Sequence, residues 1–183
     1  KEFLIVGKVK SLFGKQSCKP GARLLVLTEG EDDAMAAWQM LNDAGRNYNV
    51  CSIPNGASAE GVVDPVVLSE IEFITSHEII VLALDNDAPG QATARTLAEV
   101  LSSSVKRIKI LKMPRKDAGQ MLIDGMGSSF EKLFYTKDFH PEKVIRGSEL
   151  TIEKLRERKK MGIPLPWPKL QSKLQGLRKG EIT

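Results

Sequence analysis

The stretch from Ile79 to Asp87 constrains the fold of this chain most. Six consecutive apolar residues, mostly Ile, Val and Leu, end in two acids separated by Asn86. A short continuous apolar run predicts a strand buried on both faces inside a parallel sheet. Side chains alternate along a strand, so we expect Asp85 and Asp87 to point the same way and to attract a hard cation such as Mg²⁺. The alternative is that one Asp caps the next helix and the other is solvated.

Segments with strand and helix character alternate along the chain. Strands are expected at 24–28, 48–53, 79–84 and 106–113, and helices at 34–41, 64–74, 91–101, 119–123 and 128–135, with Pro89-Gly90 turning the chain before the third helix. Connections of this length between strands require a parallel arrangement. The pattern predicts an α/β fold with a central, mostly parallel four-stranded sheet flanked by helices. Beyond it, a helix capped by Ser148 or Thr151 and a proline-rich spacer at 162–168 predict a helical and extended linker.

Acids follow three of the four predicted strands. They are Glu29, Asp33, Asp85, Asp87 and Asp117, and a glycine-containing loop at 54–58 follows the remaining strand. Because sites in open α/β sheets form at the carboxyl ends of the strands, we expect these residues to converge. Five converging carboxylates are hard to keep charged together without a bound metal.

Composition limits the remaining possibilities. A chain of 183 residues with 42% apolar and 27% charged residues has room for one well-buried domain and an appendage, and it has no apolar run long enough to cross a bilayer. Cys18 and Cys51 are interpreted as unrelated single cysteines in a reducing compartment, without a disulfide or a zinc site. The net charge of +4 is concentrated at 1–23 and 106–116. Such clusters are either solvated faces or binding surfaces for a polyanion.

Two motifs carry a family resemblance. Glu29-Gly30-x-x-Asp33 and Asp85-x-Asp87-x-x-Gly90 resemble the Toprim domain, which bacterial-type primases, type IA and type II topoisomerases and some nucleases share. The closer resemblance is to the fused primase–helicases of T7-like phages and their mitochondrial relative Twinkle. The segments that carry it are Leu12-Phe13-Gly14, Gly56-Ala57-Ser58, Lys116-Asp117-Ala118 and the last residues, 176–183, which are similar to the entry of the helicase domain. One departure is Gly119-Gln120, which stands where the family has Asn-Glu.

The resemblance implies a domain organisation. Residues 1–22 are a basic lead-in that ends an N-terminal primase subdomain, 23–143 are the Toprim catalytic domain, and 144–183 are a linker and the start of a helicase domain. A template-reading zinc module and the helicase ATPase would lie outside this chain, so ATP binding and hydrolysis are expected only of the full-length parent, and no zinc is expected here.

The resemblance also implies an activity. The chain would be the catalytic core of a DNA primase, a nucleotidyltransferase that makes short RNA primers on single-stranded DNA from NTPs. Glu29 would act as general base or ligand, and Asp85 and Asp87 would hold Mg²⁺, for which Mn²⁺ substitutes, with Asp33 and Asp117 assisting. Residues that would contact nucleotide or DNA are Lys1, Gly56, Ser58 and Lys116. For Lys1 the alternative is a solvated lysine, and for Gly56 and Ser58 it is a structural turn.

Partners and competing functions follow from the same resemblance. The full-length protein would form a hexamer or heptamer through its helicase domains, without a membrane, in the cytoplasm of a phage-infected bacterium or in the mitochondrial matrix. The alternative function is a non-catalytic Toprim module that couples DNA to a hexameric replicative helicase. A nuclease or topoisomerase is a third interpretation. Neither Tyr48 nor Tyr135 lies in a persuasive context for a topoisomerase nucleophile.

Overall fold

The computed structural model describes residues 10–54, 63–141 and 163–174. The chain divides into two compact units, Lys1–Lys143 and Val144–Thr183. In the second unit the described residues contain one helix, α8 (Pro168–Leu174). The predicted helix at 148–161 and the helicase-like residues 176–183 lie outside the described residues. The domain boundaries therefore stay predictions.

The first unit is built on one sheet of four strands. They are β1 (Leu24–Thr28), β2 (Asn49–Ser52), β3 (Ile79–Ala83) and β4 (Arg107–Ile110), in the order β2-β1-β3-β4. All three strand pairs are parallel, and Val26 of β1 pairs with Val50 on one side and Val81 on the other. The predicted four-stranded sheet is confirmed, and its parallel order places the carboxyl ends of all four strands at one edge.

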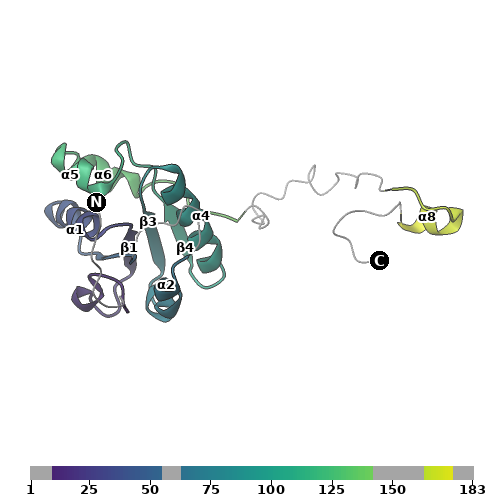
Figure 1. Cartoon of the computed structure of the whole chain (residues 1–183), viewed down its shortest axis with the longest axis horizontal. Coiled ribbons are helices and arrows are strands. Elements are labelled where there is room, and N and C mark those ends of the chain that lie inside the picture. Colours follow the sequence, from purple (N-terminus) through teal and green to yellow (C-terminus); the bar gives the residue numbers. More distant parts are fainter. Residues whose placement is uncertain (1–9, 55–62, 142–162, 175–183) are drawn as a thin grey trace, which may run out of the picture. The chain divides into compact units, whose positions relative to one another are not determined.

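Helices cover both faces of this sheet (Figure 1). One face packs against α1 (Glu31–Asp43), α5 (Ala118–Ile123) and α6 (Gly127–Leu133), and the other against α2 (Pro65–Ser69), α3 (Ile71–Thr75) and α4 (Ala88–Leu101). Alternating residues of β1 divide between the two cores, with Leu25 and Leu27 on the α4 side and Leu24 and Val26 on the α1 side. The predicted α/β class is confirmed. No helix among the described residues is long and apolar enough to cross a membrane.

Two helix predictions were wrong in detail. The helix α4 begins at Ala88, so Pro89 and Gly90 lie in its first turn and do not form a separate turn before it. Proline fits there because the first helical N–H groups have no partner within the helix. The segment after Asp64 forms α2 and α3 instead of one helix, with the break at Glu70, whose carboxylate is paired with Lys15.

The N-terminal segment packs closely on the edge strand β2. Leu12 is 1% exposed and belongs to the core, and Phe13 forms an antiparallel bridge with Ser52. Gly14 has a φ of 82°, and a Cβ there would lie 2.8 Å from the carbonyl oxygen of Val50. After the short 3₁₀ helix η1 (Lys15–Ser17), the chain leads to Cys18 beside the same strand.

The other edge strand, β4, is shorter than predicted and more covered. The alternation of Ile108 and Ile110 with basic residues predicts an edge, and β4 is an edge strand. Its Lys109, however, is 7% exposed and not solvated, because its Nζ donates to the carbonyl oxygen of Thr136 and lies 3.0 Å from Asp138 Oδ1. The chain after α6 thus covers one side of this edge.

Candidate active site

Two carboxylates lie next to each other at the ends of the two central strands, β1 and β3. Glu29 directly follows β1, and Asp85 lies two residues beyond β3 with 8% exposure. The backbone N–H of Asp85 donates to Glu29 Oε2 at 3.3 Å. Because β1 and β3 are hydrogen-bonded neighbours, this contact is a direct product of the strand order.

Asp33 and Asp117 meet across Gly119. Asp33 lies in the first turn of α1, and its Oδ1 accepts from the N–H of Gly119 at 2.9 Å. Asp117 caps α5, and its Oδ1 accepts from the N–H of Gln120 at 2.7 Å. A side chain on Gly119 would begin 3.4 Å from Oδ1 of each acid. The residue that departs from the family pattern therefore presents its own backbone to the acidic cluster.

Lys116 places a positive charge among these acids. Its Nζ lies 2.9 Å from Asp85 Oδ2 and 3.8 Å from Asp117 Oδ2. The hydrogen bond and negative charge of Asp85 raise the pKa of Lys116. Asp85 and Asp117, which follow β3 and β4, thus hold the positive charge of Lys116 between them.

Asp87 has a different environment from Asp85. Its Oδ1 accepts from the N–H of Gly90 at 2.9 Å, so Asp87 caps α4 and remains exposed. Because β3 ends at Ala83, the strand alternation from which a shared direction of Asp85 and Asp87 was predicted does not extend to them. The capping alternative holds for Asp87, but Asp85 is buried and not solvated.

Two hydrogen bonds from Asn86 to backbone carbonyl oxygens fix the loop that carries Asp85 and Asp87. The N–H of Asn86 donates to the carbonyl oxygen of Lys116 at 2.7 Å, and its side-chain amide donates to the carbonyl oxygen of Met113 at 2.8 Å. These bonds join the loop after β3 to the loop after β4. No local pattern predicts this role of Asn86, because it depends on which loops become neighbours.

The acids that surround Asp33 affect its pKa. Its pKa is raised, first by burial and also by the nearby charges of Asp117 and Asp85, while the hydrogen bond from Gly119 acts in the opposite direction. A partly buried carboxylate among like charges favours any bound cation that relieves the repulsion.

The donor set fits Mg²⁺ in its chemistry. The candidate ligands are hard carboxylate oxygens, and Mg²⁺ commonly uses one or two carboxylates together with waters and substrate phosphates. Within 10–54, 63–141 and 163–174, no group of three or more His, Cys, Asp or Glu side chains is arranged to hold a metal ion. Each of Asp33, Asp87 and Asp117 gives one oxygen to a backbone N–H, and Lys116 contacts Asp85. Metal binding therefore stays a prediction.

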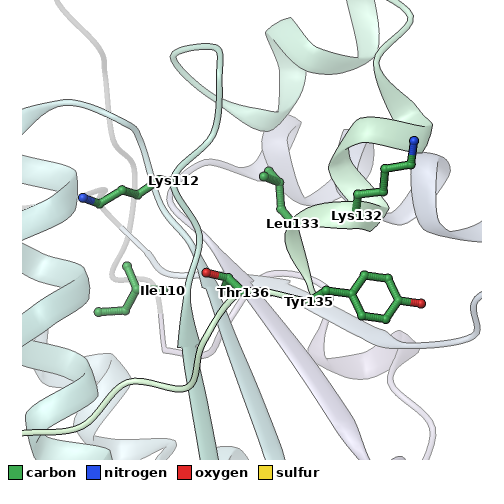
Figure 2. A pocket seen from close by; sticks show the side chains of 6 residues that line it. All are labelled: Ile110, Lys112, Lys132, Leu133, Tyr135 and Thr136. Carbon is green, nitrogen blue, oxygen red and sulfur yellow. The ribbon is translucent and has the colours of Figure 1, made fainter.

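Several predicted contacts with nucleotide or DNA are not placed. Lys1, Gly56 and Ser58 lie outside the described residues, and Lys116 is the one that the structure brings to the acids. A groove of about 410 Å³ lies beside β4 and the end of α6 (Figure 2). It contains none of the predicted site residues, and its Lys112 and Tyr135 side chains extend in opposite directions (Figure 2). The groove is therefore separate from the acidic edge.

The two cysteines were interpreted incorrectly from the sequence. Cys18 Sγ and Cys51 Sγ lie 3.4 Å apart, so they are neighbours and not unrelated single residues. No spacing motif could reveal this contact, because it forms only when the N-terminal segment packs on β2.

Comparisons with known proteins agree with this geometry. A family model described as Toprim-like matches residues 26–122. One similar solved structure is of the bacteriophage T7 lagging-strand DNA polymerase interacting with primase domains of two gp4 subunits bound to an RNA/DNA hybrid and dTTP. It is 26% identical with a TM-score of 0.58, over 74% of this chain and 66% of that one. Another is the primase fragment of the bacteriophage T7 primase-helicase protein, which is also 26% identical with a TM-score of 0.58, over 69% of this chain and 49% of that one. This chain thus spans just under two thirds of the first and about half of the second, and no curated protein sequence matches it.

Proposed function

Because this chain belongs to the Toprim-like family, we propose that it is the catalytic core of a DNA primase within a primase–helicase. The core would synthesise short RNA primers on single-stranded DNA. The similarity to the T7 primase fragment at 26% identity supports primase-type chemistry over that of other Toprim proteins.

One observation supports the proposal most strongly. Carboxylates from separate segments, Glu29, Asp33, Asp85 and Asp117, come together at the carboxyl edge of a parallel sheet with Lys116 among them. Helix capping explains the positions of Asp117 and Asp87, but it does not explain why Asp85 lies buried beside Glu29. A buried acid with three partly buried acids gathered around it at this edge is typical of a functional site.

The reaction assigns a task to each of these residues. The 3′-hydroxyl of the growing primer attacks the α-phosphorus of an incoming NTP, a P–O bond forms, and the bond to pyrophosphate breaks. Glu29 takes the proton of the attacking hydroxyl as general base. Lys116, which reaches the acids from an exposed position, binds the triphosphate and offsets its negative charge.

Metal binding would complete this arrangement. Asp85 and Asp87 would hold Mg²⁺, with Asp33 and Asp117 assisting. The ion would supply neutralisation of the charge that develops around the phosphorus in transit. The hydrogen bonds of the Asn86 backbone N–H and side-chain amide keep the loop of Asp85 and Asp87 next to Lys116 and Asp117, so that substrate does not have to order it.

The partners follow from the same proposal. They are a single-stranded DNA template, NTPs, and the helicase domain of the same or an adjacent subunit in a hexamer or heptamer. The cellular location, an infected bacterium or a mitochondrial matrix, remains a prediction from the resemblance.

Template-dependent primer synthesis by the full-length protein tests the function. Random-sequence single-stranded DNA, labelled NTPs and Mg²⁺ would be supplied, and products would be resolved by length. Short RNA products are expected from the wild type and from Asp32→Asn, an exposed acid next to Asp33. They should be lost in Asp85→Asn, because that change removes a buried carboxylate of the site.

The alternative function has its own signature in the same assay. A non-catalytic module that couples DNA to the helicase would bind the DNA and make no primer in any variant. Products from Asp85→Asn equal to those from the wild type would remove the acidic edge from the chemistry.

A further inference from the structure

Two thiols meet where the N-terminal segment packs on the sheet. Cys18 follows η1 and Cys51 lies within β2, 33 positions further along the chain, with their sulfur atoms 3.4 Å apart. A disulfide bond is about 2.05 Å long, so a small approach of the sulfurs would complete it. Both residues are free cysteines in this structure.

The two thiols differ in access and in acidity. Cys51 is 0% exposed, whereas Cys18 is half-buried and reachable from solvent. The hydrogen bond between the two sulfur atoms lowers the pKa of Cys18 despite its partial burial. The same hydrogen bond, together with burial, raises the pKa of Cys51. The thiolate, which is the reactive form, is thus favoured at the accessible position.

The surrounding backbone holds this pair in place. Gly14 lies against Val50 and Cys51, where a Cβ would be 2.8 Å from a backbone oxygen and 3.7 Å from the Cα of Cys51. Phe13 bridges Ser52, whose N–H donates to the carbonyl oxygen of Phe13 at 3.2 Å. The contacts of Gly14 and Phe13 therefore hold the N-terminal segment against β2 at the residues on both sides of Cys51.

We propose that Cys18 and Cys51 form a reversible oxidative modification site, which a hydroperoxide converts into an intramolecular disulfide. The Cys18 thiolate attacks the peroxide oxygen, the O–O bond breaks, and Cys18 becomes a sulfenic acid. The Cys51 sulfur then attacks the Cys18 sulfur, the S–S bond forms, and the hydroxyl leaves as water with the Cys51 proton. Two thiols and one hydrogen peroxide give one disulfide and two waters.

The bond would fasten the N-terminal segment to β2. It closes a loop that contains β1 and α1, and a cross-link of this span removes conformational freedom from the unfolded chain. The expected result is a rise of roughly 10 °C in the melting temperature of the oxidised protein. This modification goes beyond the proposed function and does not depend on primase activity.

Intact mass, thiol labelling and thermal melting of the whole chain test the proposal. After hydrogen peroxide treatment, the wild type should lose the mass of two hydrogen atoms and resist alkylation at both cysteines after unfolding. Its melting temperature should rise, and a dithiol reductant should reverse all three changes. Peptide mapping should find Cys18 joined to Cys51.

Two variants separate this pathway from simple oxidation. Cys18→Ser changes a half-buried position, should fold, and should show neither the mass loss nor the melting shift. Cys51→Ala removes the resolving thiol, so Cys18 should stop as a sulfenic acid, with a gain of one oxygen mass, and react with a dimedone probe. The proposal is overturned if the oxidised wild type gains oxygen without losing hydrogen, if Cys51 remains alkylatable, or if the disulfide forms only between chains.

Discussion

Gly90 lies against the backbone of the loop that carries Asp85 and Asp87, with no room for a side chain. A Cβ at this position would lie 2.4 Å from the carbonyl oxygen of Asp85, which is backbone and cannot move aside cheaply. We therefore expect Gly90→Ala to lower the free energy of unfolding by about 1–3 kcal/mol, as overpacking does. Urea unfolding followed by circular dichroism measures this change.

The matched control is Gly127→Ala. Gly127 also lies in the first turn of a helix, but a Cβ there would meet only the side chain of Met40, at 3.5 Å. Alanine is the better helix former by up to about 1 kcal/mol, so this variant should be as stable as the wild type or more stable. Equal stability of both variants would show that Gly90 is not constrained by Asp85.

A second prediction concerns Lys116, because its ammonium group lies where a bound metal ion would also be attracted to Asp85. Replacing Lys116 with Met removes a positive charge 2.9 Å from Asp85 and should raise the affinity for Mn²⁺ a few-fold. Paramagnetic broadening during a Mn²⁺ titration measures this affinity. Lys112→Met, an exposed lysine of the same basic segment, should leave it nearly unchanged.

Removing the acids should have the opposite effect on Mn²⁺ binding in the same titration. The double change Asp85→Asn/Asp87→Asn should abolish the specific broadening. Equal broadening in the double variant and the wild type would contradict the metal assignment, whatever Lys116 does.

The sequence predicted the acids of the site better than their contacts. Glu29, Asp33, Asp85 and Asp117 could be found because each follows a strand at one edge of a parallel sheet. The ion pair of Lys116 with Asp85, and the hydrogen bond from Gly119 to Asp33, join residues far apart in the chain. They depend on how two loops pack, which local pattern does not determine.

At the scale of elements, the segment after α6 holds the edge strand β4 through one carboxylate. Asp138 Oδ2 lies 2.9 Å from Arg107 Nε, and Asp138 Oδ1 lies 3.0 Å from Lys109 Nζ. The N–H of Phe139 also donates to the carbonyl oxygen of Ile108. We expect Asp138→Asn to lower the free energy of unfolding at neutral pH by about 1–3 kcal/mol, because hydrogen bonds to charged groups are lost.

The pH dependence of this effect has a definite sign. Burial raises the pKa of Asp138, but hydrogen bonds from Arg107 and Lys109 outweigh it, and the net pKa is lowered. A carboxylate with a depressed pKa in the folded state stabilises above its unfolded value of about 3.9 and loses that contribution as pH falls further. The stability difference between the wild type and Asp138→Asn should therefore shrink from neutral pH to about pH 3. A difference that stays constant would rule out the charged form as its source, and Asp32→Asn serves as the exposed control.

Element boundaries show where local pattern is sufficient and where it fails. The strands could be predicted because continuous apolar runs mark burial on both faces, and β1 and β3 divide their side chains between two cores. The start of α4 was placed too late because Pro89 reads as a turn, although Asp87 caps the helix ahead of it. The break between α2 and α3 lies at Glu70, which pairs with Lys15 across 55 positions, and local pattern predicts neither the break nor the pairing.

For the whole molecule, the alternation of strands and helices predicts the fold class. It does not predict which of the basic side chains are paired with acids. The basic segment 106–116 predicts a surface for a polyanion, yet most of its side chains are paired with acids of the same unit. The paired residues are Lys106, Arg107, Lys109, Arg115 and Lys116. We therefore expect weak affinity of this chain for single-stranded DNA.

The salt dependence of DNA binding checks this expectation. Each neutralised phosphate adds about 0.7 to the magnitude of the slope of log affinity against log salt for single strands. Fluorescence anisotropy across salt concentrations should give a slope below about 3, because few basic groups are free to release counterions. A slope above about 4 would mean that the ion pairs open on binding.

In the proposed function the acids at the edge of the sheet perform nucleotidyl transfer, and replacing Glu29 tests this role. The measurement compares primer synthesis by Glu29→Gln and by Asp32→Asn in the full-length protein, with melting temperatures recorded for both. We predict a rate at least about 100-fold lower for Glu29→Gln, because a general base is lost, with little change in melting temperature. Asp32→Asn should retain the wild-type rate, since it removes the same charge from an exposed position. A Glu29→Gln protein that folds normally and makes primers at the wild-type rate would rule out Glu29 as the general base and would contradict nucleotidyl transfer by these acids.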